Sequence, residues 1–257
     1  MTYLRPVTLE DAIRLGGSGG DAAYLAGGHT LIPAMKARLR DPDKLIDIGQ
    51  LAELKGIDRD GDRLWVGAGT THAGVEAGAG GIPALAHMAS LIGDPQVRAR
   101  GTLGGALANN DPAADYPAAA LALDAVIETD RAAHSAEDFF QGMFYTALEE
   151  GELIRRVGFR IPDRAAYEKF RHPASRYAIA GVFVAFLGGE PRVAVTGAGG
   201  DGVFRWTEAE EALEAESDLG NIGAPDPADM TSDIHAGAEY RAHLCTVMLK
   251  RAVENLS

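Results

Sequence analysis

The chain is poor in cysteine and in basic residues. It has 257 residues and one cysteine, Cys245, which excludes a disulfide within the chain and any zinc or iron–sulfur site that takes all its ligands from cysteines of this chain. Lys and Arg number 24 against 37 Asp and Glu, for a formal net charge of −13. Nucleic-acid binding depends on clustered Lys and Arg that neutralise phosphates, so this balance argues against a nucleic-acid partner.

Targeting and membrane signals are equally scarce. The first residues, MTYLRP, lack the basic-then-apolar order of a secretory signal peptide. No apolar run approaches the roughly 18 residues that a membrane-spanning helix needs. We therefore expect a cytoplasmic protein with no membrane span.

Motifs of hydrolases and zinc enzymes do not occur either. The seven histidines form no H-x-x-x-H or H-E-x-x-H pair, and no G-x-S-x-G sequence is present. Cys245 lies in a predicted helix over 238–254, where we expect it to be a small core residue. A literal G-x-G-x-x-G at 197–202 follows a predicted strand, but no helix follows it, so we interpret it as a hairpin loop. We predict no catalytic residue and no metal ligand in this chain.

Glycine, by contrast, is abundant, with 32 residues, and one cluster lies at a predicted strand-to-helix turn. Residues 22–26 have the pattern of a short strand, Gly27-Gly28-His29 follow, and Thr30 is expected to cap a helix that continues to Leu39. A second strand over 44–48 would complete a β-α-β unit. Backbone N–H groups in such a turn bind phosphate readily, although an ordinary connecting turn has the same pattern.

The second glycine cluster lies within residues 100–115, RGTLGGALANNDPAAD. Its Gly-Gly pair lets a ligand approach the backbone with no Cβ in the way, and its hydroxyl, amide and carboxylate groups suit a ligand with many polar atoms. The alternative is a glycine-rich turn followed by a helix that starts at Asp-Pro. Together the two clusters fit a ligand with a pyrophosphate and a polar ring system, which is the general shape of a flavin dinucleotide.

The pattern of the chain changes near Pro162. Before this proline we predict strands and helices in alternation, with strands over 63–68, 125–129 and 154–161 and helices over 83–92 and 118–123. After it we predict a mostly apolar stretch over 177–187, a strand over 191–196, and helices over 208–216 and 238–254.

Three segments resemble the FAD-binding medium subunits of the xanthine dehydrogenase/carbon monoxide dehydrogenase family, the molybdenum hydroxylases. Residues 26–36, AGGHTLIPAMK, resemble the first flavin loop of these subunits, and residues 93–115 resemble the second. SDIHAGAEYR at 232–241 resembles their C-terminal signature. The three segments stand in the family's order across nearly the whole chain.

The resemblance implies an α+β fold. It comprises a two-lobed FAD-binding domain of the vanillyl-alcohol-oxidase/PCMH type, followed by a small α+β C-terminal domain with an antiparallel sheet and helices. On this basis we place an FAD-binding subdomain with the pyrophosphate loop at 1–55, a second FAD-binding subdomain at 56–162 and the C-terminal domain at 163–257.

The resemblance also implies which residues bind FAD. The first loop is expected to wrap the pyrophosphate with its backbone N–H groups, contributed by Ala26, Gly27, Gly28, His29 and Thr30. The second loop is expected to line the other side of the cofactor with Thr102, Gly104 and Gly105, and with Asn109 nearby.

Later positions complete the implied site. Asp115 is expected to hold a ribityl or adenosine-side hydroxyl, and the backbone of Ile154 to touch the adenine end. Lys169 matches a lysine that contacts the cofactor, and Tyr177 a tyrosine beside the isoalloxazine ring. Arg176 departs from the family pattern, which has an acidic residue there.

The resemblance further implies an electron-transfer role. FAD would be the cofactor of this chain, and its partners would be a large subunit with a molybdenum cofactor and a small subunit with two [2Fe–2S] clusters, in a dimer of heterotrimers. Electrons would pass from the iron–sulfur clusters through FAD to an external acceptor. Two alternatives remain open: a stand-alone flavin oxidase or reductase with its own substrate, and a flavin-free scaffold that only joins the other subunits.

Overall fold

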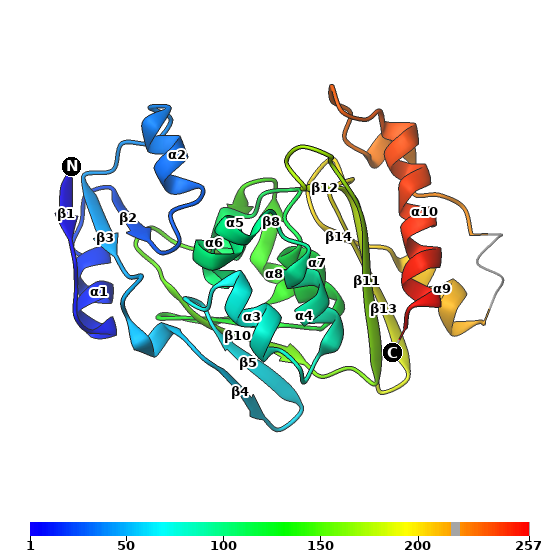
Figure 1. Ribbon diagram of the computed structural model, residues 1–257, viewed down its shortest axis with the longest axis horizontal. Helices are drawn as coiled ribbons and strands as arrows, with labels where there is room; N and C mark the ends of the chain where they lie inside the picture. Colours follow the sequence, from blue (N-terminus) through cyan, green and yellow to red (C-terminus); the bar gives the residue numbers. More distant parts are fainter. Residues whose placement is uncertain (217–221, 257) are drawn as a thin grey trace.

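The computed structural model describes residues 1–216 and 222–256. Three main sheets follow one another along the described chain, from the N-terminal lobe through a central lobe to a C-terminal sheet (Figure 1). The predicted α+β class is confirmed. Within the described residues, no helix is both long and apolar enough to cross a membrane.

The N-terminal lobe is a parallel three-stranded sheet with the strand order β1-β3-β2. Its elements are β1 (Thr2–Leu4), α1 (Leu9–Gly16), β2 (Ala22–Leu25), α2 (Leu31–Lys36) and β3 (Lys44–Asp47). β2, α2 and β3 form the predicted β-α-β unit, with the first glycine cluster between β2 and α2.

Helix α2 differs from its prediction in two respects. Thr30 stands directly before the first helical residue, as predicted, but its side chain makes no capping hydrogen bond. The helix ends at Lys36, and Arg38 then takes a left-handed conformation with φ 59° that cannot continue it. Leu39 therefore lies beyond the helix, with 80% of its surface exposed. The predicted side-chain cap and the continuation to Leu39 were wrong.

The central lobe packs short helices on a five-stranded antiparallel sheet with the order β4-β5-β10-β6-β7. Its strands are β4 (Ile57–Asp60), β5 (Arg63–Gly67), β6 (Val126–Thr129), β7 (Ala133–Ser135) and β10 (Ile154–Arg160). Its helices are α3 (His72–Gly78), α4 (Pro83–Ser90), α5 (Pro95–Arg100), α6 (Leu103–Asn109), α7 (Tyr116–Ala122) and α8 (Ala136–Phe139). A 3₁₀ turn, η1 (Ala52–Leu54), precedes the sheet, and a small hairpin, β8 (Phe140–Gly142) with β9 (Tyr145–Thr146), follows α8.

The C-terminal region is a four-stranded antiparallel sheet covered by a long helix. Its elements are β11 (Arg164–Arg171), β12 (Ala178–Leu187), β13 (Glu190–Thr196), β14 (Phe204–Arg205), α9 (Thr207–Glu214), η3 (Pro227–Asp229) and α10 (Ala238–Glu254). β13 pairs with β14 in antiparallel fashion, which confirms that the G-x-G-x-x-G sequence is a hairpin loop. The helix over 238–254 is also confirmed, and Cys245 is buried in it, where burial raises the pKa of the thiol to about 12.

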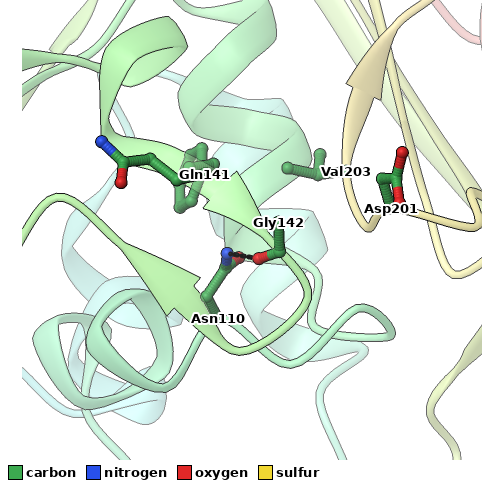
Figure 2. Close-up of a pocket in the computed structure, with 6 residues that line it drawn as sticks. Asn110, Gln141, Gly142, Asp201 and Val203 are labelled. Carbon is green, nitrogen blue, oxygen red and sulfur yellow. Dashed lines mark hydrogen bonds between the residues drawn. The ribbon is translucent and has the colours of Figure 1, made fainter.

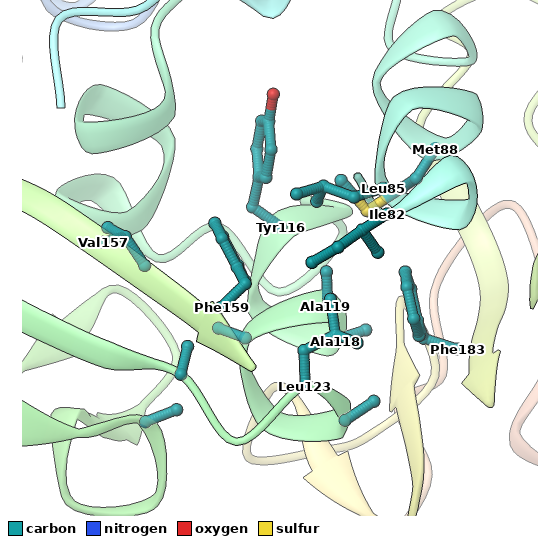
Figure 3. Packing of buried hydrophobic residues seen from close by; sticks show 14 of the residues in the cluster. Ile82, Leu85, Met88, Tyr116, Ala118, Ala119, Leu123, Val157, Phe159 and Phe183 are labelled. Carbon is teal, nitrogen blue, oxygen red and sulfur yellow. The ribbon is translucent and has the colours of Figure 1, made fainter. Parts of the chain in front are cut away.

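Strand β12 is buried along its whole length because both faces of the sheet are covered. Phe183 and Ala185 belong to the core shared with the central lobe, where helices α4 and α7 lie (Figure 3). Val182 and Val184 point to the opposite face and pack in a second core with α10 (Figure 1). Alternate residues of a strand face opposite sides, so a continuous apolar run is what a doubly covered strand requires.

Candidate functional site

A cavity of about 700 Å³ opens between the N-terminal lobe and the helices α5 and α6 of the central lobe. We call it the main cavity. Four segments line most of it: residues 26–31 after β2, residues 101–116 around α6, the loop at 148–152, and residues 175–177 between β11 and β12. A volume of this size, enclosed by several segments, is typical of a cofactor site.

Ten of the thirteen residues predicted to bind FAD line the main cavity. They are Ala26, Gly27, Gly28, His29, Thr30, Thr102, Gly105, Asn109, Asp115 and Tyr177. The other three, Gly104, Ile154 and Lys169, lie behind its wall and do not line it. The structure therefore brings both predicted loops to one cavity, together with a tyrosine from the C-terminal region.

The first loop reaches the cavity through two glycines with different roles. Gly28 has φ +75°, a left-handed conformation that a side chain disfavours. Gly27 lies against the second loop, and a Cβ there would overlap the carbonyl oxygen of Arg100. Among the described residues, no backbone carbonyl accepts a hydrogen bond from the N–H groups of Gly27, Gly28 or His29. These donors are available to an anionic ligand.

The second loop is held by a cap and by close packing. The Thr102 hydroxyl accepts a hydrogen bond from the N–H of Gly105 at 3.2 Å, which fixes the start of α6. Gly104 serves the packing of this helix, because a Cβ there would stand 2.6 Å from the Cβ of Ala68. Thr102 and Gly105 thus face the cavity, while Gly104 brings α6 close to the strand end behind it.

Asp115 lines the cavity but already has protein partners. Lys169 Nζ lies 2.9 and 3.0 Å from its two carboxylate oxygens, and the side chains of Lys169 and Asp115 are 1% and 5% exposed. The hydroxyl of Tyr167 donates to the same carboxylate, and burial, with Asp115 beside it, raises the pKa of that phenol. Lys169 is therefore placed behind Asp115, where it holds the carboxylate in position at the cavity wall.

The remaining predicted positions have contrasting environments. Ile154 is 4% exposed and belongs to the hydrophobic core of the central lobe. Tyr177 is 48% exposed and lies at the cavity beside Arg176, which holds a left-handed φ of 64°. Burial and the nearby Asp111 and Asp115 raise the pKa of Tyr177, so the phenol keeps its proton at neutral pH.

His72 and Tyr116 are two of the cavity residues that were not among the predicted site residues. They line the cavity with 6% and 1% of their surface exposed, and their rings stand 5.3 Å apart. Within the described residues, neither His72 Nδ1 nor the Tyr116 hydroxyl has a hydrogen-bond partner. Figure 3 shows the hydroxyl directed away from the labelled apolar side chains. A histidine at the start of a helix and a tyrosine after Asp115 carry no local signal that separates them from core residues.

A smaller cavity of about 480 Å³ contains none of the predicted residues. It is lined by Asn110, Phe140, Gln141, Gly142, Asp201 and Val203. Asn110 has φ 42°, and its amide donates to the carbonyl oxygen of Gly142 at 2.8 Å (Figure 2) and to that of Tyr145 at 2.9 Å. The amide therefore serves to fix the β8–β9 hairpin next to α6.

The residues of the main cavity fit an extended polar cofactor. Glycines allow close approach, free N–H groups suit a diphosphate, and two buried polar atoms lack partners among the described residues. Over residues 1–216 and 222–256, no group of three or more His, Cys, Asp or Glu side chains is arranged to hold a metal ion.

Comparisons with known proteins agree with this chemistry. Residues 1–163 match the family described as "FAD binding domain in molybdopterin dehydrogenase". The chain is 36% identical to the carbon monoxide dehydrogenase medium chain of Afipia carboxidovorans, over 98% of this chain and 95% of that protein. It is 33% identical to the nicotine 6-hydroxylase medium subunit of Paenarthrobacter nicotinovorans, again over 98% and 95%.

Solved structures give the same result. A chain of the cyanide-inactivated Cu,Mo-CO dehydrogenase matches with a TM-score of 0.89 and 35% identity, over 99% of this chain and 96% of that chain. The fold is accordingly a two-lobed α+β FAD-binding fold, and FAD is the cofactor of this chain. From the family match and these relatives, the chain belongs to the FAD-binding medium subunits of the molybdenum hydroxylase family, and is an oxidoreductase subunit.

Proposed function

We propose that this chain is the electron-transfer subunit of a molybdenum hydroxylase, which receives electrons from iron–sulfur clusters of a partner and passes them through FAD to an external acceptor. The observation that carries the proposal is the main cavity, which two glycine loops from two lobes shape for one long polar cofactor. Bound FAD supplies the redox chemistry, and the protein supplies position and electrostatics.

The proposed roles of the residues follow their placement. The N–H groups of residues 27–29 bind the pyrophosphate, and Thr102 and Gly105 line the opposite wall with Asn109. Asp115, held by Lys169, accepts a hydrogen bond from a cofactor hydroxyl. Tyr177 shields the isoalloxazine ring, and the positive charge of Arg176 beside it favours the anionic form of the reduced ring by Coulomb attraction.

The proposed partners come from the family. Relatives are named medium chain or medium subunit, of carbon monoxide dehydrogenase and of nicotine 6-hydroxylase. We propose a large molybdenum-cofactor subunit and a small [2Fe–2S] subunit as partners, in a dimer of heterotrimers. The proposed domains are 1–55, 56–162 and 163–257; the last includes residues 217–221 and 257, which lie outside the described residues, and the three main sheets fall within these ranges.

The test is purification of the full chain from its own cells together with the chains that accompany it. We expect a yellow complex that contains molybdenum and iron, and a separated FAD-containing chain without either metal. Dithionite should reduce the flavin of the separated chain, and ferricyanide or a quinone should reoxidise it. Rapid reduction of that flavin by an organic substrate of the complex would instead identify a stand-alone flavoenzyme, and a colourless chain in an active complex would identify a scaffold.

A further inference from the structure

Among the described residues, few buried polar side-chain atoms lack a hydrogen-bond partner, and two of them belong to residues that line the main cavity. Within residues 1–216 and 222–256, four buried side-chain atoms have no hydrogen-bond partner: His72 Nδ1, Tyr116 OH, His134 Nε2 and Arg241 Nε. His72 and Tyr116 both line the main cavity. A buried polar atom without a partner costs stability, so two neighbouring ones at a ligand cavity indicate that the ligand supplies their hydrogen bonds.

His72 lies where the two glycine loops meet. As the first residue of α3 it donates its backbone N–H to the carbonyl oxygen of Gly101 at 2.9 Å. Gly101 has no Cβ, and one built there would stand 2.5 Å from His72 Nε2. Gly27 of the first loop packs on the adjoining carbonyl of Arg100. The imidazole therefore packs against Gly101 of the second loop, next to the point where Gly27 of the first loop meets that loop.

Tyr116 continues the same wall. It directly follows Asp115, begins α7 and holds its ring 5.3 Å from that of His72. The ring is anchored in the hydrophobic core, while its hydroxyl is directed away from the apolar side chains (Figure 3). The core packing thus fixes the phenol ring, and the imidazole ring lies beside it.

Both groups are neutral hydrogen-bonding groups at physiological pH. Burial, with smaller effects of His29 and Arg98, lowers the pKa of His72 to about 4. Burial raises the pKa of Tyr116 far above its ordinary value. A neutral imidazole offers one donor and one acceptor, and a phenol offers both, which matches a ligand that presents hydroxyls and phosphate oxygens side by side.

We propose that His72 and Tyr116 are FAD-binding residues, a polar pair that hydrogen-bonds the diphosphate–ribityl part of the cofactor between the two loops. This rests on the proposed function of the main cavity. The pair lies at the junction of the two loops. It contributes side-chain hydrogen-bonding groups to the site, whereas the loops contribute mostly backbone groups.

The test measures the FAD dissociation constant of the full-length FAD-free chain by quenching of flavin fluorescence. Tyr116→Phe removes one hydroxyl and leaves the ring, so we expect affinity to fall about three- to tenfold, the value of one hydrogen bond. His72→Phe should have an effect of similar size, and His72→Asn, whose amide can replace an imidazole N–H, should restore part of it. Tyr3→Phe is the matched control, because its hydroxyl bonds Asp47 and Tyr3 does not line the cavity.

Thermal unfolding of the FAD-free variants gives a second measurement. A hydroxyl without a partner contributes nothing to the FAD-free chain, so Tyr116→Phe should leave the unfolding temperature unchanged or raise it. Wild-type FAD affinity in both Tyr116→Phe and His72→Phe would overturn this inference and leave the proposed function standing. A wild-type chain that takes up no FAD would overturn both.

Discussion

Two regions of the molecule use buried polar groups in opposite ways. In the C-terminal region, Glu210 accepts hydrogen bonds from the N–H of Val193 at 2.8 Å and from Arg205. Arg241, 4% exposed, donates from its two terminal nitrogens to two backbone carbonyls and to Asp233, and only its Nε lacks a partner among the described residues. At the main cavity, His72 and Tyr116 are as deeply buried, yet their side chains bond to nothing in the described part of the chain.

The difference separates polarity that holds the fold from polarity reserved for a ligand. A buried group with protein partners stabilises the chain before any ligand arrives, and its loss leaves other groups without partners. A buried group without partners lowers the stability of the FAD-free chain. When the cofactor binds, the group gains a hydrogen bond, and the FAD-bound state is stabilised. Substitutions of the partnered groups in the C-terminal region should therefore mainly lower stability. Substitutions of the unpartnered groups at the main cavity should mainly lower FAD affinity.

Asp115 is the strongest challenge to this division, because it lines the cavity and is paired. Asp115→Ala should lower the free energy of unfolding by about 3–5 kcal/mol, since it leaves the buried ammonium of Lys169 without its counter-ion. FAD occupancy of the purified chain should also fall. Urea unfolding of the FAD-free chain and the ratio of flavin to protein absorbance measure the two effects.

The double variant Asp115→Ala/Lys169→Met separates them. Removal of both charges should recover much of the lost stability. If its FAD affinity stays low, Asp115 contacts the cofactor directly. Wild-type affinity in the double variant would contradict the proposed contact and place Asp115 with the groups that hold the fold.

Arg241 tests the other side of the comparison. Arg241→Met keeps the apolar length of the side chain but removes the donors to the carbonyls of Ile179 and Gly197 and to Asp233. We expect a loss of about 2–4 kcal/mol in the free energy of unfolding, because buried carbonyls lose their partners. FAD affinity of the folded protein should remain within twofold of the wild type, measured by titration well below the unfolding temperature. A tenfold loss of affinity without a loss of stability would reverse the comparison.

The sequence predicts the parts of this structure that local pattern controls. The helix over 238–254 and the hairpin at 197–202 follow from apolar spacing and from glycine, and both glycine loops lie at the cavity. Helices α5 and α6 were not predicted, and in α6 a Gly-Gly pair disfavours helix. The Thr102 cap and the close packing of Gly104 on Ala68 nevertheless fix α6.

Local sequence pattern cannot predict contacts between segments that lie far apart in the chain. Lys169 and Asp115 lie 54 residues apart, and nothing in either segment indicates that they form an ion pair. His72 and Tyr116 are similar, because a residue becomes part of a cavity only when separate elements pack around it. The family resemblance predicts Asp115 and Lys169 as site residues. Only the structure shows that Asp115 lines the cavity and that Lys169 lies behind it, paired with its carboxylate.

The smallest expected effect is a change in the pH dependence of stability at His72. Its pKa is 6.5 in the unfolded chain and about 4 in the folded one, so between these values the unfolded state binds more protons. The free energy of unfolding of the FAD-free chain should therefore fall as the pH falls from 6.5 towards 4, and His72 should account for at most about 3 kcal/mol of that fall. His72→Phe should flatten this part of the profile in urea unfolding, whereas Arg241→Met should shift the profile down and keep its slope. Equal slopes for wild type and His72→Phe would mean that the imidazole is not held neutral at the cavity. His72 would then no longer support the contrast between the two regions.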